Sequence, residues 1–545
     1  MRERYERTPA APRPRRARTR LAAVLALLAA LLVPGVGGAQ QASAAGPSFR
    51  FVDIPVAPGV ALKANVYVPA GADAAHPAPV VVMPASWSMP TLEYVVPARQ
   101  LAESGYIALS YTARGFWLSG GEIGVAGPDD VADISRVIDW ALANTPADAS
   151  RIGMAGVSYG AGLGLLGAAH DPRIKAVAAL SGWADLVDSI YMGQTQHVQS
   201  AAGLAVAGYL TGRPSSEFSQ FLVDFLTTAN VPELIAWANV RSPATYVDRL
   251  NANGAAVMLA NAWGDSIFPP NQLAEFYGRL TVPKRLEFRP GDHATPEIPG
   301  LAGLPNDTWA NTRAWLDRYL KGTDNGIDRQ PPVQIKPRLE GGYEGYADWA
   351  DLTGSRLDLR LGDNGWSRTG PLAPDAGTGW STRIGTNVDS GANGGIIFLT
   401  NLVEEYLRIP PTVSVPMLPR AVAAVWQSDR LAAESQVRGT ANLHVTVTPT
   451  ASQGTFIAYL YDVDALGVGR LVTHAPYTFF GKQAWRPFAA DVELLATAYD
   501  VPAGHRLALV VDTVDLLYLE QNPALSSLAF GSPAADPSWI SVPLR

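Results

Sequence analysis

The chain contains no cysteine among its 545 residues. This absence excludes disulfide bonds, thiolate zinc sites and a cysteine nucleophile, so stability must come from packing. Histidine is also scarce, with seven residues, which leaves few candidates for a general base. Acidic residues outnumber basic ones, so the formal net charge is −7 and the pI is about 5.6. This balance argues against nucleic acid or an anionic membrane surface as the partner.

Long apolar runs are missing everywhere except near the N-terminus. There, a segment with five arginines between residues 13 and 20 is followed by an apolar run over 21–33 and then by small residues up to Ala45. This order of charge, apolar core and cleavage site is typical of a secretory signal. The run is shorter than the roughly 20 residues that a membrane span needs. We therefore predict a signal peptide over 1–45 and a secreted protein, with a retained N-terminal anchor as the alternative.

Residues 46–330 alternate short apolar runs with helical stretches, as an α/β domain requires. Strands are expected at 49–56, 60–68, 80–83, 107–111, 151–155, 174–180, 255–260 and 284–289, and helices over 96–104, 129–144, 161–169 and 309–320.

The alternation stops between residues 182 and 255. This stretch is helical in pattern and rich in aromatic residues such as Trp183, Phe221 and Trp237. We predict a helical lid over about 183–254 that covers the site and shapes substrate choice. A plain helical extension of the core is the alternative.

Beyond residue 331 glycine and proline become frequent, and apolar residues alternate with polar ones. Examples are 443–447 (LHVTV), 456–461 (FIAYLY) and 507–511 (LALVV). This pattern predicts an all-β domain over 331–545, built as a jelly-roll β-sandwich.

Five residues, Gly156 to Gly160, spell G-V-S-Y-G between an expected strand and an expected small-residue helix. Strand, sharp turn and helix are the context of a nucleophile elbow, which holds its serine in a strained conformation. The glycines on either side would let strand and helix pass closely. We interpret Ser158 as a nucleophile, with a loop that carries no chemistry as the alternative.

A serine hydroxyl needs an imidazole base and a carboxylate that orients it. In an α/β-hydrolase the acid and then the histidine follow the nucleophile, each after a later strand. Asp265 follows the strand at 255–260, and His293 follows the strand at 284–289. Asp292 is a rival for the acid, but it adjoins His293 in sequence, which makes a bond to the same ring awkward. We therefore predict a Ser158–His293–Asp265 triad.

The oxyanion hole needs two donors aimed at the developing alkoxide. The backbone N–H of Tyr159, directly after the nucleophile, is the first. The second is expected from the loop after the strand at 80–83, where Trp87 is the candidate through its backbone or indole N–H. Packing of Trp87 against substrate or lid is the alternative.

These residues together resemble the cocaine esterase and X-prolyl dipeptidyl aminopeptidase family of α/β-hydrolases, which includes α-amino acid ester hydrolases. The resemblance covers about 48–545. It implies a serine hydrolase with a jelly-roll domain. One departure is that family members commonly place a tyrosine in the oxyanion loop, where this chain has Trp87. Further motifs that carry the resemblance are Gly105-Tyr106, Arg114-Gly115, Ser119-Gly120, Gly127-Pro128, Asp133, Asp139-Trp140, Asp171-Pro172-Arg173, Trp263-Gly264-Asp265, Tyr461 to Asp464 and Tyr499 to His505.

We therefore expect a secreted serine hydrolase that cleaves acyl esters, or amides, through an acyl-enzyme. The alternative is an exopeptidase that removes dipeptides from peptide N-termini. That activity needs a carboxylate for the substrate ammonium, and five lid residues could supply one. A cell-envelope binding protein with a degenerate hydrolase is a third hypothesis. The lid carboxylates are Asp185, Asp188, Glu217, Asp224 and Glu233.

The expected partner is a small acyl ester, amide or short peptide, with no nucleic acid and, after signal removal, no membrane. No cofactor or metal is predicted, because Asp, Glu and His do not cluster at ligand spacing. The carboxylates of the β region leave a calcium site open.

Overall fold

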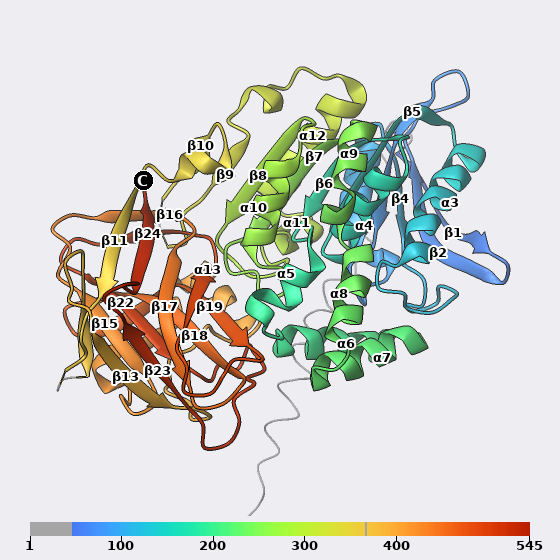
Figure 1. Ribbon diagram of the computed structural model, residues 1–545. Helices are drawn as coiled ribbons and strands as arrows, with labels where there is room; N and C mark the ends of the chain where they lie inside the picture. Colours follow the sequence, from blue (N-terminus) through green and yellow to red (C-terminus); the bar gives the residue numbers. More distant parts are fainter. Residues whose placement is uncertain (1–45, 340, 366–367) are drawn as a thin grey trace, which may run out of the picture. The chain divides into compact units, whose positions relative to one another are not determined.

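A computed structural model describes residues 46–339, 341–365 and 368–545 (Figure 1). The predicted signal peptide over 1–45 lies outside the described residues. Within the described part of the chain, no helix is both long and apolar enough to cross a membrane.

The first half of the chain forms a ten-stranded sheet, in the order β1-β2-β4-β3-β5-β6-β7-β8-β9-β10. From β4 to β9 neighbouring strands are parallel, while β1, β2 and β10 are antiparallel to their neighbours. The central strands are nearly continuous apolar runs, as expected of a parallel sheet covered on both faces. The strands are β1 (Ser48–Ala57), β2 (Val60–Val68), β3 (Ala78–Pro84), β4 (Ile107–Tyr111), β5 (Ala147–Val157), β6 (Ile174–Leu180), β7 (Ala256–Ala262), β8 (Lys284–Arg289), β9 (Val333–Ile335) and β10 (Glu344–Tyr346).

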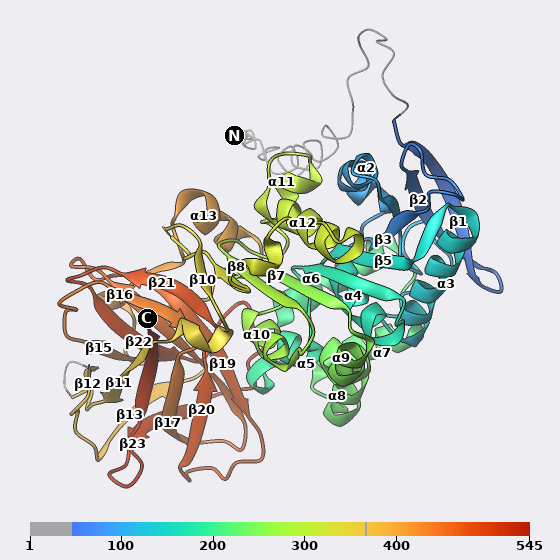
Figure 2. The same cartoon turned by 90° about the horizontal axis from the view of Figure 1, so that it is seen from above.

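Helices cover both faces of this sheet (Figures 1 and 2). Along β5, Ile152 and Met154 pack into the core beneath α3, α4 and α10, while Ala155 and Val157 pack into a second core beneath α2 and α12. Because successive side chains of a strand point to opposite faces, β5 contributes to two separate cores. The helices are α2 (Val95–Glu103), α3 (Pro128–Asn144), α4 (Tyr159–His170), α10 (Pro270–Arg279), α11 (Ile298–Leu301) and α12 (Asp307–Lys321).

Between β6 and β7 the chain is helical, as the pattern over 182–255 predicts. Helix α6 contains no charged residue, and it has both buried and exposed apolar side chains. The helices are α5 (Leu186–Ile190), α6 (Val198–Thr211), α7 (Ser216–Thr227), α8 (Val231–Val240) and α9 (Val247–Asn253).

The remaining strands pair in a second, mostly antiparallel network with its own apolar core. One helix, α13 (Leu399–Leu407), interrupts it and is not expected from the sequence. The strands are β11 (Ser355–Leu361), β12 (Thr369–Ala373), β13 (Trp380–Gly385), β14 (Thr412–Ser414), β15 (Ala424–Ser428), β16 (Ser435–Gly439), β17 (Asn442–Pro449), β18 (Gly454–Val463), β19 (Val468–Phe479), β20 (Phe488–Glu493), β21 (Thr497–Val501), β22 (Arg506–Asp512), β23 (Ser527–Ser532) and β24 (Trp539–Leu544).

The predicted fold class, an α/β-hydrolase followed by a β region, is confirmed by these two sheets. The boundary between the two sheets lies later in the chain than the change of composition suggests. Strand β9 pairs with β8, and β10 pairs with β9. The first sheet therefore continues to Tyr346, past residue 331, where the change of composition predicts a new domain.

Candidate active site

Ser158 lies between β5 and α4 with φ 56° and ψ −116°, a conformation that residues with side chains rarely adopt. Its backbone N–H donates to the Leu180 carbonyl oxygen at 2.8 Å. A Cβ added at Gly156 would lie 2.6 Å from the Gly160 carbonyl carbon, and one at Gly160 would lie 2.1 Å from the Pro84 carbonyl oxygen. Only glycine fits these two close approaches, so the turn can project the serine away from the sheet.

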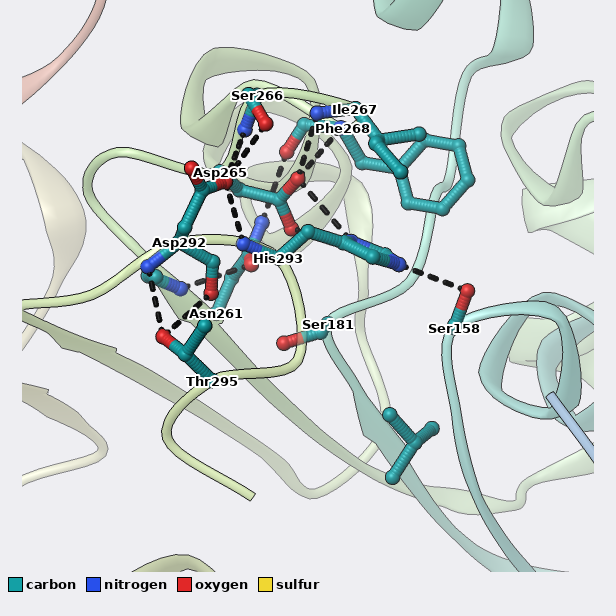
Figure 3. A network of polar contacts seen from close by, with 12 residues as sticks. Ser158, Ser181, Asn261, Asp265, Ser266, Ile267, Phe268, Asp292, His293 and Thr295 are labelled. Atoms are coloured by element: carbon teal, nitrogen blue, oxygen red, sulfur yellow. Dashed lines mark hydrogen bonds and ion pairs between the residues drawn. The ribbon is translucent and has the colours of Figure 1, made fainter. Parts of the chain in front are cut away.

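His293 and Asp265 come from the ends of β8 and β7. Because carboxyl ends of parallel strands meet at one edge of the sheet, the three side chains converge (Figure 3). His293 Nε2 lies 2.8 Å from Ser158 Oγ, and its Nδ1 lies 3.0 Å from Asp265 Oδ2. All three residues are buried. The structure thus brings together the three residues that the sequence predicts as a triad.

The Asp265 carboxylate is itself held in place. Its Oδ1 accepts hydrogen bonds from the backbone N–H groups of Ile267 at 2.9 Å and Phe268 at 2.7 Å. Asp292, the rival candidate, bonds to the backbone of His293 rather than to its ring. Its carboxylate accepts the backbone N–H of His293 at 2.6 Å and faces away from the nucleophile (Figure 3).

The electrostatics of the site favour a basic imidazole. Burial alone would lower the pKa of His293, but the charge and hydrogen bond of Asp265, with contributions from Asp292 and Glu297, raise it above the ordinary 6.5. A raised pKa makes Nε2 a better proton acceptor for the Ser158 hydroxyl.

The two predicted oxyanion donors lie beside the nucleophile. Tyr159 is the first residue of α4, so its N–H has no partner within the helix. The indole of Trp87 donates to the Leu204 carbonyl oxygen of α6 at 2.8 Å, and its ring packs against Tyr159 and Phe218. The indole N–H is therefore already bonded to α6, which leaves the backbone N–H of Trp87 as the remaining candidate.

A pocket opens beside Ser158, and the helices between β6 and β7 line part of it. Among the residues that the structure describes, neither a carboxylate nor a cation lines it, and aromatic rings form much of its wall. Its lining residues are Trp87, Val125, Ser158, Tyr159, Trp183, Leu186, Ile190, Ala201, Leu204, Ala205, Phe218, Phe221, Leu222, Trp237 and Phe268.

The five carboxylates of the predicted lid lie outside this pocket. Asp185 caps α5 by accepting the N–H groups of Val187 and Asp188. Glu217 pairs with Arg241 at 3.2 Å, and Asp224 accepts from Gln220 at 2.9 Å. Asp188 lines a different pocket and Glu233 is exposed.

Two glutamates that support the site are not identified by the sequence analysis. Glu93 accepts the N–H and the hydroxyl of Ser86, at 2.8 and 2.5 Å, and so holds the loop that carries Trp87. Glu297 accepts the hydroxyl of Ser181 at 3.0 Å, just after β6. Burial raises the pKa of each glutamate to about 7. A lone acid within an apolar stretch, as in T-L-E-Y-V-V, is the signal that could have indicated the first.

Known protein families match both parts of the chain. The sequence model of the X-Pro dipeptidyl-peptidase (S15) family matches residues 58–295, and that of the X-Pro dipeptidyl-peptidase C-terminal non-catalytic domain matches 325–530. The chain therefore carries the two domains of the X-Pro dipeptidyl-peptidase type, an S15 peptidase domain and a C-terminal non-catalytic domain. The family resemblance predicted from the sequence is thus confirmed, and S15 is a family of serine hydrolases, the enzyme class that the sequence predicts.

Relatives of this S15 chain have different names. A Mycobacterium bovis protein assigned as a serine esterase is 24% identical over 315 residues, which is 51% of this chain and 48% of that protein. A Streptomyces avermitilis protein assigned as a Xaa-Pro dipeptidyl-peptidase is 21% identical over 470 residues, or 75% of this chain and 67% of that protein. The chain thus spans about half the length of the first relative.

Solved structures share the fold across nearly the whole S15 chain. An α-amino acid ester hydrolase superposes with a TM-score of 0.67 at 18% identity, covering 94% of this chain and 99% of that one. A CocE/NonD family hydrolase from Staphylococcus aureus gives 0.70 at 13% identity, covering 94% and 99%. At such identity the likeness concerns the fold alone.

Proposed function

We propose that the chain hydrolyses esters of apolar acyl groups through an acyl-enzyme on Ser158. His293 Nε2 takes the hydroxyl proton while Ser158 Oγ attacks the ester carbonyl carbon. Asp265 holds the imidazole tautomer and stabilises the imidazolium. The contacts of 2.8 Å and 3.0 Å along this chain of three side chains support the roles.

In the next step the tetrahedral intermediate carries its negative charge on the former carbonyl oxygen. The backbone N–H groups of Tyr159 and Trp87 are the proposed donors to that oxygen. The intermediate collapses when His293 returns its proton to the leaving alcohol. Water then attacks the acyl-enzyme with His293 again as base, and the carboxylic acid is released as Ser158 regains its proton.

The apolar pocket beside Ser158 is the observation that favours an ester with an apolar acyl group. An ammonium group placed there would be desolvated without a carboxylate partner, which is strongly unfavourable. A dipeptidyl-peptidase needs such a partner, and the lid carboxylates lie elsewhere. Fluorophosphonate labelling of the folded protein would count against the degenerate-hydrolase alternative.

A panel of p-nitrophenyl acyl esters, with alanyl-prolyl anilide in free and N-acetylated forms, tests this proposal. We expect burst kinetics with the esters, kcat/KM that rises from acetyl towards longer acyl groups, and little turnover of either anilide. Ser158→Ala should lose at least ~10³-fold in kcat. Preferential cleavage of the free-amine anilide would instead support the exopeptidase, and unchanged turnover by Ser158→Ala would overturn the nucleophile.

We also infer that the protein is exported, from the order of charge, apolar run and small residues in 1–45. Expression of the full chain in a bacterial host should release protein to the medium or cell envelope with a new N-terminus near Ala45. An intact N-terminus on cytoplasmic protein would contradict this inference.

A further inference from the structure

A short segment of the C-terminal region reaches the two loops that carry Asp265 and His293. It consists of residues 397–405 and includes most of α13, and we refer to it as the α13 segment. Its contacts join residues more than 100 positions apart in the chain. The sequence alone indicates no function for this segment.

Asp292 is the main contact of the α13 segment in the hydrolase part. Its Oδ1 accepts the N–H and hydroxyl of Ser266, at 2.9 and 2.7 Å, and the backbone N–H of His293 at 2.6 Å. Its Oδ2 accepts the N–H of Phe398 at 2.9 Å and the side-chain amide of Asn401 at 3.1 Å. One fully buried carboxylate thus joins the acid loop, the base loop and the α13 segment.

Asn401 reaches both loops with a single amide group. Its Nδ2 donates to the Gly264 carbonyl oxygen at 2.6 Å and to Asp292 Oδ2 at 3.1 Å. Both partners are acceptors, so the orientation of the amide is determined by chemistry. Gly264 directly precedes Asp265, and Asp292 directly precedes His293. The two protons of one side chain therefore hold the neighbours of the proposed acid and base.

The packing at Gly264 is consistent with this role. A Cβ at Gly264 would lie 2.5 Å from Asn401 Cγ, so the amide rests directly against the backbone of the acid loop. This contact explains the glycine in the Trp263-Gly264-Asp265 motif. No left-handed φ is needed at this position, because Gly264 is not among the positive-φ residues.

Two further bonds anchor the α13 segment beyond Asn401. Glu405 accepts the hydroxyl of Thr295 at 2.8 Å, two residues after His293. Glu404 is buried and forms a two-pronged ion pair with buried Arg338. Buried, hydrogen-bonded ion pairs resist rearrangement because breaking one leaves an uncompensated charge. The amide of Asn401 is thus presented from a fixed helix.

We propose that Asn401 and Asp292 are positioning residues that set the distance and angle between Asp265 and His293, and that the C-terminal region thereby completes the active site. This inference rests on the proposed triad. A displacement of about 1 Å in a catalytic group can cost on the order of 10²-fold in rate. Loss of the Asn401 amide therefore slows the acylation step without changing the acyl pocket, which belongs to other elements.

The test compares Asn401→Ala and the nearly isosteric Asn401→Leu with Tyr406→Ala as matched control, since Tyr406 lies on the exposed face of the same helix. Each variant is assayed as the full-length protein, with p-nitrophenyl butyrate as the substrate. We expect kcat to fall about 10- to 100-fold for both Asn401 variants, with KM within about twofold of wild type. Tyr406→Ala should behave as wild type.

The pH profile separates positioning from general stability. Asp265 raises the pKa of His293. If the contact between the two side chains is weakened in the Asn401 variants, the pKa of His293 falls and the acid limb of kcat/KM moves to lower pH. Asn401→Asp should be worse than Asn401→Ala, because a second carboxylate would then face the Asp292 carboxylate. Combining Asn401→Asp with Asp292→Asn should restore part of the loss, since the repulsion is removed and an amide again faces a carboxylate.

The outcomes are distinct. Wild-type kcat and an unmoved acid limb in Asn401→Ala would overturn the positioning role while leaving the triad proposal intact. The positioning role would also be overturned if the loss of activity were fully explained by a smaller folded fraction and the acid limb of kcat/KM did not move. Wild-type protein that takes no fluorophosphonate label and cleaves no ester would instead overturn the proposed function, and the positioning role with it.

Discussion

The backbone of Ser158 adopts a positive φ, which residues with a side chain rarely do. Its N–H donates to the Leu180 carbonyl oxygen in β6. Gly156 and Gly160 have no side chains, so strand, turn and helix can lie in direct van der Waals contact. Strain of this kind persists only where the surrounding structure over-determines it. Small changes at the flanking glycines should therefore affect function before they affect the overall fold.

Gly160→Ala is the sharpest of these changes. Its methyl group would lie 2.1 Å from the Pro84 carbonyl oxygen, at the start of the loop that carries Trp87. We expect overpacking to cost about 1–3 kcal/mol in the free energy of unfolding, and kcat to fall at least ~10²-fold because the oxyanion loop is displaced. Gly203→Ala is the control, since its methyl group would meet nothing within 4 Å. Equal activity of the two variants would contradict the account of the elbow.

The protonation of His293 should govern the acid limb of activity. The base must be neutral to accept the Ser158 proton, and Asp265 raises its pKa above the ordinary 6.5 despite burial. Activity should therefore rise with pH through a midpoint above 6.5. Asp265→Asn should lower kcat strongly and move any residual acid limb to lower pH. The measurement is kcat/KM with a p-nitrophenyl ester from about pH 5 to 9, and a flat profile would exclude His293 as the base.

At the scale of elements, α6 lies between the pocket beside Ser158 and the outside. Ala205 lines the pocket beside Ser158, whereas Ala202, one turn earlier, is exposed. Ala205→Trp should fill the pocket, so that kcat/KM for octanoyl esters falls at least ~10-fold while acetyl esters are turned over nearly as before. Ala202→Trp adds the same side chain to the outer face and should change neither substrate. Equal losses for both chain lengths would mean that the pocket does not receive the acyl group.

Elements with strong local patterns could be predicted from the sequence, and those that depend on distant contacts could not. The strand before Asp265 is an apolar run, and the strand before His293 alternates the apolar Leu286 and Phe288 with charged residues. Parallel topology brings the ends of the two strands together. Helix α13 shows the helical spacing of apolar residues in its sequence LTNLVEEYL, so the element itself could have been predicted. Its role could not, because its polar residues Asn401, Glu404 and Glu405 are paired with residues far away in the chain. The composition change at 331 likewise fails to indicate that β9 and β10 complete the first sheet.

Trp87 marks the limit of prediction within the site. Its position in the loop after β3 could be inferred from the order of strands. The bond of its indole to Leu204 could not, because it depends on where α6 lies over the pocket. The choice between its two N–H groups therefore required the structure.

At the scale of the whole molecule, a chain without cysteine holds a two-sheet structure together through polar contacts as well as apolar cores. Asn271 donates to the Leu494 carbonyl oxygen at 3.1 Å and accepts the Ala496 N–H at 2.6 Å. Thr195 bonds to Thr478 at 2.7 Å. Such contacts, with the Asn401 amide, make the C-terminal region part of the same folded unit as the hydrolase part, so unfolding should be coupled between them.

Stability should also depend on pH through buried carboxyl groups. Asp130 and Glu297 are buried, and each has one carboxyl oxygen without a hydrogen-bond partner among the described residues. Burial raises the pKa of each to about 7, from 3.8 and 4.5. Since the folded state then holds protons that the unfolded state has lost, their contribution is fully present below pH ~4 and is lost as the pH rises through about 7.

Thermal unfolding should therefore show a higher Tm at about pH 5.5 than at about pH 8. At still lower pH the trend reverses. Burial alone would raise the pKa of Asp171, but its bonds to Arg173 and Ser135 lower it, and that stabilisation is lost as the carboxylate is protonated.

Asp130→Asn and Glu297→Gln remove the titrating groups, so in each variant Tm should decline less steeply above about pH 5.5. Exposed Asp324→Asn serves as the control and should leave the decline unchanged. A wild-type Tm that rises steadily over the same pH range would show that these carboxyl groups are ionised in the folded protein at little cost.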